Sequence, residues 1–236
     1  MLFYSYSKFN SVILMNDFVH TLKKSINPFH LLKHPFYKDW NAGKLNLEVL
    51  QEYSKQYFHH VDAFPRCISS IHSNCTDLKN RQVLLGNLLE EEDKENSHPD
   101  LWLKFAKGLN ISEEEVKNVD LNKETEGLIN DFLAISRSSY ASGLGALYAY
   151  EYQMPEVAKS KIKGLKAFYN ITNKDTTEFF TVHIEADEWH SEECLDLLKK
   201  LNSKEEQDAA IEGATKLAKL MWKFLDGVER ETKHLC

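Results

Sequence analysis

The chain has 236 residues, an ordinary length for one domain, and its 29 basic and 36 acidic side chains give a formal net charge of −7. This acidic balance argues against a nucleic-acid-binding protein, which would carry a basic patch or stripe. Hydrophobic residues make up 42% of the chain and charged residues 28%, a composition that excludes a disordered protein. Nine glycines and five prolines are few for this length, so long helices are favoured over a turn-rich β protein.

The N-terminus and the cysteines predict a cytoplasmic protein without a membrane segment. Residues 1–14 lack the charged and unbroken apolar regions of a signal peptide, and no run approaches the ~18 apolar residues of a membrane span. Met15 resembles a second start, so we expect a single helical domain over 1–236 with 1–14 as a non-native or disordered extension. The four cysteines form no CxxC pair, which favours reduced thiols.

The first half of the chain carries the apolar spacing of helices. Apolar residues recur at steps of three and four from Leu47 to Ile71, which predicts one long helix kinked at Pro65. A second helix is expected over about 77–92. After a polar stretch, a third helix restarts at Leu101 and stops at a glycine, residue 108.

The second half continues in the same way. Ser112 and Ser203 each have a glutamate three residues later, the spacing of a capping box at a helix start. Helices are predicted over about 123–137, 140–153, from Pro155 onward, 177–200 and 204–233. Alternating strand patterns with hairpin turns are absent from the sequence. We therefore predict an all-α bundle of about seven helices.

Two histidines and an aspartate mark the most informative predicted helix. His183, Asp187 and His190 are separated by four and then three residues, so they share one helical face. Two imidazoles and a carboxylate form a ligand set suited to iron, manganese or zinc. The alternative is a solvated helix face that contains two histidines.

Glu151 is the one charged residue between Arg137 and Glu156. The predicted helix around it is otherwise made of small and aromatic residues. A carboxylate in such a helix is seldom buried unless it is paired or metal-bound. The alternative is a glutamate at the helix end that reaches solvent beside Pro155.

The polar run 90–98 offers further ligands. Glu91 and His98 are seven residues apart, so on a continuous helix they would lie about 10 Å apart along the axis. Either they serve two ions, or the helix unwinds before Pro99. Glu95 and His98 also form the E-x-x-H spacing of ferritin-like di-iron bundles. Spacing alone leaves both glutamates open.

Together these residues suit two divalent metal ions ~3.5–4 Å apart. Oxygen and nitrogen ligands without a thiolate point toward iron or manganese and oxygen chemistry rather than structural zinc. The sequence contains no GxGxxG, P-loop, GxSxG or HExxH motif, which argues against the enzyme classes that use them.

Several of these segments resemble the CADD-like group, named after chlamydial proteins associating with death domains. The wider superfamily includes thiaminase II and pyrroloquinoline quinone synthase, and its fold is the heme-oxygenase-like helical bundle. The similarity extends from about Asn16 to Asp226. The segments that carry it are 84–92, His98, 100–102, 146–155 and 183–190.

The resemblance implies two metal ions per chain, Fe(II) or mixed Fe/Mn, that work with O2 and an external reductant. It favours Glu91 over Glu95 as a ligand. The implied ligand set is Glu91, His98, Glu151, His183, Asp187 and His190.

The resemblance also implies an oxygenase that makes p-aminobenzoate for folate synthesis from its own side chains. By position, Tyr37 would supply the ring and Lys161 the amino nitrogen, while Tyr53 and Tyr57 match site tyrosines that pass electrons. Lys161 lies in a lysine-rich run, 159–166, which is more typical of a solvated helix face.

Two other functions stay open. One is a related oxygenase that acts on a free small molecule, and the other is an interaction protein that binds a host death-domain partner, with secretion into a host as the alternative location. A homodimer is expected, because it is common in such bundles. Thiaminase-type relatives carry a nucleophilic cysteine where this chain has Gly145, so thiamin hydrolysis is not expected.

Overall fold

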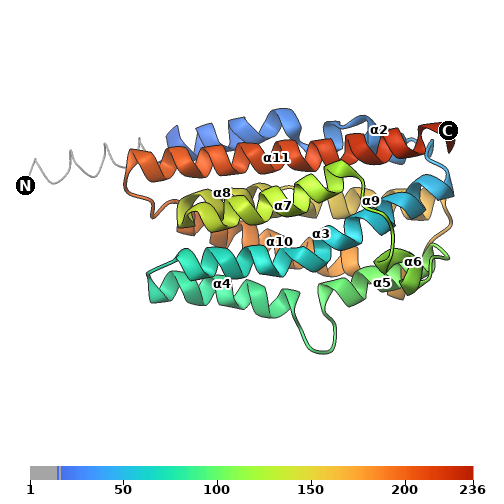
Figure 1. The fold of residues 1–236 in the computed structure, drawn as a ribbon, viewed down its shortest axis with the longest axis horizontal. Helices are drawn as coiled ribbons and strands as arrows, with labels where there is room; N and C mark the ends of the chain where they lie inside the picture. Colours follow the sequence, from blue (N-terminus) through green and yellow to red (C-terminus); the bar gives the residue numbers. More distant parts are fainter. Residues whose placement is uncertain (1–14, 16, 236) are drawn as a thin grey trace, which may run out of the picture.

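A computed structural model describes residue 15 and residues 17–235, without the side chains of 185–188 and 235. The described residues form helices and contain no strand, so the predicted all-α class is confirmed. None of the described helices has the length and apolarity needed to cross a bilayer. After a helical segment over 17–26, the α-helices are α2 (Pro35–Asn41), α3 (Leu47–Asn74), α4 (Leu78–Glu91), α5 (His98–Gly108), α6 (Glu113–Lys117), α7 (Lys123–Ser138), α8 (Tyr140–Glu151), α9 (Met154–Phe168), α10 (Lys174–Leu198) and α11 (Lys204–Thr232) (Figure 1).

The two helix starts predicted from capping boxes agree with the structure. Ser112 and Ser203 both form complete capping boxes, in which side chain and backbone satisfy each other. Segment 17–26 and α2 were not predicted. The sequence signal for α2 is weak because the helix has only seven residues and its N-cap is a histidine, His34.

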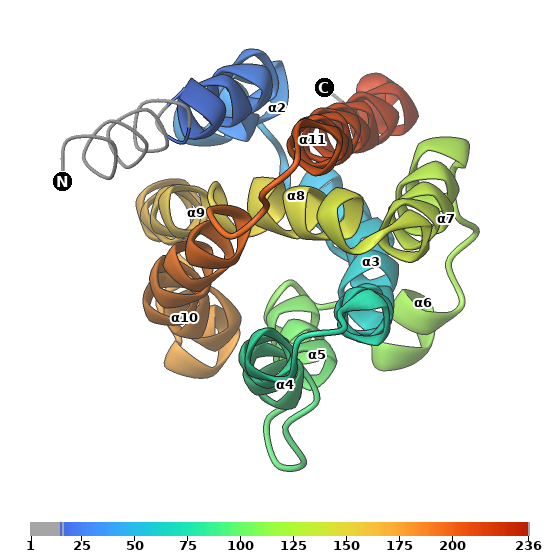
Figure 2. The same cartoon turned by 90° about the vertical axis from the view of Figure 1, so that its left-hand side faces the viewer.

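Helix α8 lies at the centre of the bundle, with the other helices arranged around it (Figure 2). Every residue from Gly143 to Glu151 is buried. A helix that is apolar on all sides is stable only inside a protein, which is where this sequence places it. The C-terminal end of α8 therefore carries Glu151 into the interior.

Glycines allow α8 and α11 to pack backbone against backbone. A Cβ atom at Gly145 would lie 2.0 Å from the Ala210 carbonyl oxygen, and one at Gly213 would lie 2.1 Å from the Ser142 carbonyl oxygen. The backbone of α11 therefore leaves no room for a side chain at Gly145.

Two contacts fix α2, the helix that carries Tyr37. The Nδ1 atom of His34 accepts a hydrogen bond from an N–H of the first turn, and its Nε2 lies 3.1 Å from a carboxylate oxygen of Asp226 on α11. On the other side, Trp40 packs against Gly164 of α9, where a Cβ would lie 2.3 Å from the indole nitrogen. These contacts hold Tyr37 in the core, where it is 2% exposed.

Replacing Gly145 with alanine tests the contact between α8 and α11. We expect Gly145→Ala to lower the free energy of unfolding by at least ~1–3 kcal/mol, because the new methyl group overlaps the α11 backbone. Gly86→Ala is the matched control, since a Cβ there meets nothing within 4 Å and should raise the free energy of unfolding by roughly 0.5–1 kcal/mol. Urea unfolding measures both, and equal effects would contradict the close contact.

Candidate metal centre

A break between α4 and α5 brings the first two candidate ligands together. Helix α4 ends at Glu91 and α5 begins at His98, so the chain unwinds between them. Ser97 caps α5 and Pro99 occupies its first turn, which explains why the helix starts before the predicted Leu101. The Nδ1 atom of His98 lies 2.5 Å from an oxygen of Glu91. Of the two alternatives for this segment, the structure has the unwound one.

His183, Glu91 and His98 together form a cluster of three buried candidate metal ligands. One candidate ligand atom from each side chain lies within 4.8 Å of the other two. The Nδ1 atom of His183 is 2.5 Å from the Phe179 carbonyl oxygen, so Nδ1 carries the hydrogen and Nε2 keeps its lone pair. Burial lowers the pKa of His183 well below its usual value, which favours the neutral form that binds metals.

The other candidate ligands on or beside these helices differ in their burial and contacts. Glu95 is exposed on the loop, whereas Glu91 is buried in the cluster. His190 is buried, and its Nε2 lies 3.2 Å from an oxygen of Glu90, a partner that the sequence did not indicate. The side chain of Asp187 lies outside the described residues.

Glu151 is 1% exposed, so the alternative of a solvent-reaching helix end is wrong. Its Oε1 accepts a hydrogen bond from the Asn87 amide at 2.5 Å, and its Oε2 lies 3.0 Å from the Cys194 sulfur. Burial raises the pKa of Glu151 to about 7, while His190 lowers it and Glu91 raises it. A nearby cation would stabilise the ionised carboxylate that burial disfavours.

The buried carboxylates and imidazoles fit an iron or manganese site. Helices α4, α5, α8 and α10 contribute buried carboxylates and imidazoles, which are ligands suited to these ions. Glu91, His98 and His183 form the central cluster. Glu151 lies close enough to Glu91 and His190 for their charges to shift its pKa. Ligation by these residues stays a prediction.

A second group of buried polar residues surrounds Lys161, which is 3% exposed. Its Nζ donates a hydrogen bond to the Tyr53 hydroxyl at 2.5 Å, and that hydroxyl is hydrogen-bonded to Tyr37. The same Nζ lies 5.9 Å from the ring centre of Tyr37 and 5.1 Å from that of Tyr57. The solvated-face alternative is therefore wrong for Lys161, although the other lysines of run 159–166 are exposed.

Burial sets the protonation states of this group. It lowers the pKa of Lys161 to about 7, so a large fraction of the amine is uncharged at neutral pH. It raises the pKa values of Tyr37 and Tyr53 above their ordinary range, so both phenols keep their protons. The rings of Tyr53 and Tyr57 stack with centres 5.5 Å apart, and the Tyr57 hydroxyl lies 2.9 Å from that of Tyr150.

A small cavity connects the two groups. Lys161, Tyr57 and His183 all line it, together with Phe179 and Phe180. Its volume is about 10 Å³, enough for one water-sized molecule. Lys161 and a candidate metal ligand therefore line the same small space.

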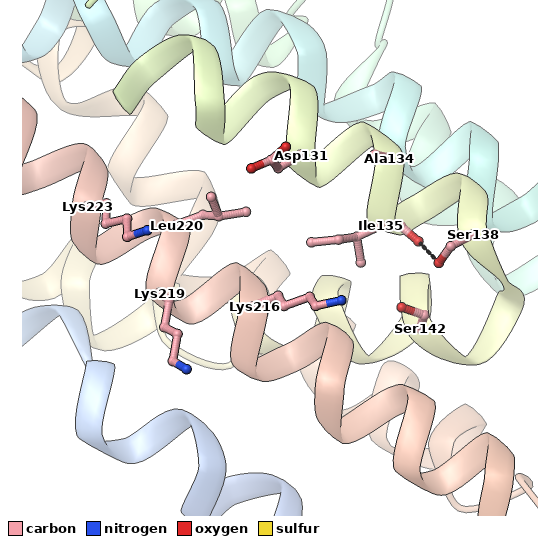
Figure 3. Close-up of a pocket in the computed structure, with 9 residues that line it drawn as sticks. All are labelled: Asp131, Ala134, Ile135, Ser138, Ser142, Lys216, Lys219, Leu220 and Lys223. Atoms are coloured by element: carbon pink, nitrogen blue, oxygen red, sulfur yellow. Dashed lines mark hydrogen bonds between the residues drawn. The ribbon is translucent and has the colours of Figure 1, made fainter. Parts of the chain in front are cut away.

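A much larger groove lies on the surface between α7 and α11, near the start of α8 (Figure 3). It has a volume of about 500 Å³, and Lys216, Lys219 and Lys223 surround it. Among the residues whose side chains the structure describes, none of the predicted ligands, the site tyrosines or Lys161 lines this groove. The described chemistry is therefore buried in the bundle rather than set in an open surface groove.

Comparison with known proteins identifies the class. A family described as iron-containing redox enzymes matches residues 51–222, most of the chain. The chain belongs to this family and is a redox enzyme of the predicted heme-oxygenase-like fold. A domain from Shewanella denitrificans with a heme oxygenase-like fold has a TM-score of 0.77 at 19% identity, covering 92% of this chain and 93% of that one.

The relatives also confirm the resemblance to the CADD-like group. The 4-aminobenzoate synthase of Chlamydia pneumoniae is 38% identical over 220 residues, which cover 93% of this chain and 98% of that protein. A CADD-like protein of unknown function from Nostoc punctiforme has a TM-score of 0.77 at 17% identity, covering 93% of this chain and 98% of that one.

Burial of Lys161 predicts a pH-dependent stability. Between pH 7 and 10.5 the unfolded chain holds the Lys161 proton and the native chain does not, so this group makes the free energy of unfolding rise with pH across that window. We expect Lys161→Met to flatten this rise and to stabilise the metal-free protein near pH 6.5 by roughly 2–4 kcal/mol. Urea unfolding of both proteins at pH 6.5 and pH 9.5 measures these free energies.

The exposed Lys163 supplies the matched control. Lys163→Met should leave the pH dependence of the free energy of unfolding unchanged, since this side chain is solvated in both states. A Lys161→Met protein with the wild-type pH dependence would contradict the buried amine.

Proposed function

We propose that this enzyme makes p-aminobenzoate in an O2-dependent reaction, using the Tyr37 side chain for the ring and Lys161 for the nitrogen. The observation that carries the proposal is the buried Lys161 amine, hydrogen-bonded to Tyr53 and through it to Tyr37. The relative from C. pneumoniae carries the name 4-aminobenzoate synthase, which supports the same product here. As a folate precursor, this product would enter folate synthesis.

The chemical formulae of tyrosine and product agree with this source. A tyrosine side chain has a six-membered ring with Cβ opposite the phenolic oxygen, and p-aminobenzoate has a carboxyl carbon opposite nitrogen. With O2 as the oxidant, the Cα–Cβ bond of Tyr37 breaks, Cα stays in the backbone, and Cβ is oxidised to the carboxyl carbon. The phenolic oxygen leaves as water when nitrogen takes its place on the ring. The nitrogen comes from Lys161: Cε is oxidised to the imine level, water cleaves its bond to Nζ, Cε remains as an aldehyde, and the nitrogen stays on the ring.

The six predicted ligands would hold two iron ions, or one iron and one manganese, whose chemistry when bound is to activate O2 with electrons from an external reductant. The chain's own residues prepare the organic partners. The lowered pKa of Lys161 supplies an uncharged amine, the form that acts as a nucleophile. The phenol of Tyr37 is held in the core by α2 and shielded from water.

The small cavity favours the chain's own side chains over a free substrate. At about 10 Å³, the space beside Lys161 and His183 has room for a water-sized molecule rather than an aromatic acid. An oxygenase acting on a free molecule would need this region to open. The stacked rings of Tyr53 and Tyr57 support a role for them in passing electrons between the ligands and Tyr37.

Isotope labelling tests the source of the ring. Protein made with ring-labelled tyrosine, loaded anaerobically with Fe(II) and exposed to O2 with a reductant, should release labelled p-aminobenzoate, detected by mass spectrometry. Tyr37→Phe should reduce the yield at least a hundredfold, because the ring then lacks its phenolic oxygen. Tyr169→Phe is the matched control and should keep the yield, since this tyrosine is only part-buried and bonds the Leu45 carbonyl.

Other outcomes identify the alternatives. Product that persists in Tyr37→Phe would show a free substrate. An interaction protein would release no product and would keep its partner after substitution of the metal ligands. The homodimer and the death-domain partner stay predictions.

A further inference from the structure

We propose that Asn87 and Cys194 are positioning residues of the metal centre that hold the Glu151 carboxylate in the orientation for metal binding. The inference rests on the proposed function, because it takes Glu151 as a ligand. It assigns roles to two buried side chains that neither the ligand set nor the tyrosine–lysine group uses.

Asn87 and Cys194 each donate a hydrogen bond to a different oxygen of the Glu151 carboxylate. The Asn87 amide N–H binds Oε1 at 2.5 Å, and the Cys194 thiol binds Oε2 at 3.0 Å. Both donors are buried, Asn87 at 4% exposure and Cys194 at 2%. Neither oxygen can therefore exchange its protein donor for bulk water.

Both donors come from helices that also carry candidate ligands. Asn87 precedes Glu91 by four residues on α4, so the two lie on one face one turn apart. Cys194 follows His190 by four residues on α10, and it is eleven residues after His183, close to three helical turns. The helices that place the other ligands thus also place the donors for Glu151.

The arrangement leaves the carboxylate able to bind metal. Each carboxylate oxygen has two lone-pair sites, and the one donor that each oxygen has among the described side chains leaves a second site for a metal ion. The terminal torsion of a glutamate has a broad preference, so without donors the carboxylate plane would be poorly fixed. The two hydrogen bonds fix that plane before a metal ion arrives, which lowers the cost of ordering the ligand.

Asn87 carries a cost that its contribution to folding does not explain. Its Oδ1 atom is buried and has no hydrogen-bond partner among the described residues. An unpaired buried acceptor destabilises the fold, so an apolar residue of similar size would suit this position as well. The N–H bond to Glu151 is the interaction that an asparagine makes here and a leucine would not.

Metal affinity measured on the full chain tests the proposal. Anaerobic Fe(II) titration of metal-free protein would compare Asn87→Leu, Cys194→Ala and Cys194→Ser with the wild type. We expect Asn87→Leu and Cys194→Ala to weaken binding about 10–100-fold, the usual effect of removing a residue that orients a ligand. Cys194→Ser should stay close to wild type, because a hydroxyl also donates a hydrogen bond.

Cys67→Ala is the matched control. It removes a buried thiol from α3 and should leave metal affinity unchanged, although its stability falls. Unfolding of each metal-free variant separates a loss of fold from a loss of affinity. If Asn87→Leu does not fold, the difference in Fe(II) affinity between Cys194→Ala and Cys194→Ser tests the proposal on its own.

Wild-type affinity in folded Asn87→Leu and Cys194→Ala would overturn the proposal, as would equal losses in Cys194→Ser and Cys194→Ala. A wild-type protein that binds no Fe(II) at all would instead overturn the metal centre of the proposed function. The two failures are therefore distinguishable.

Discussion

Burial of ionisable side chains in an apolar bundle is the constraint on which the rest of this structure depends. Removing a carboxylate or an amine from water is costly unless its charge is neutralised or paired. Glu151 meets the constraint with a raised pKa and two donors, and Lys161 meets it with a lowered pKa and a bond to Tyr53. Both shifts bring the pKa near 7, where either group changes protonation at little cost. Such groups are typical of catalytic sites.

The fold supplies the two groups separately and joins them through one small cavity. The break between α4 and α5 and the buried end of α8 bring Glu91, His98 and Glu151 inside. Helices α2, α3 and α9 bring Tyr37, Tyr53 and Lys161 together on the other side. His183 and Lys161 line the same cavity, so the candidate ligands and the lysine amine lie next to each other inside the bundle.

The sequence predicted the parts of the site that leave a local pattern. Two patterns singled out residues that are buried in the structure: the helical spacing of His183 and His190, and the isolated charge of Glu151. Other parts depend on tertiary contacts. Lys161 shares its run with exposed lysines, so its burial by α2 and α3 leaves no local signal. Asn87 and Cys194 become informative only once α4 and α10 meet at the end of α8. The start of α5 did have a signal, Ser97 followed by Pro99, and the spacing of apolar residues concealed it.

The most direct test of the account is the metal content of the wild-type chain. Elemental mass spectrometry after anaerobic Fe(II) loading and desalting counts the ions that the buried donors retain. The account predicts about two iron ions per chain, since the predicted ligand set is that of a dinuclear site. A folded chain that retains no metal would contradict it, because the buried carboxylates and imidazoles would then serve some purpose other than oxygen chemistry.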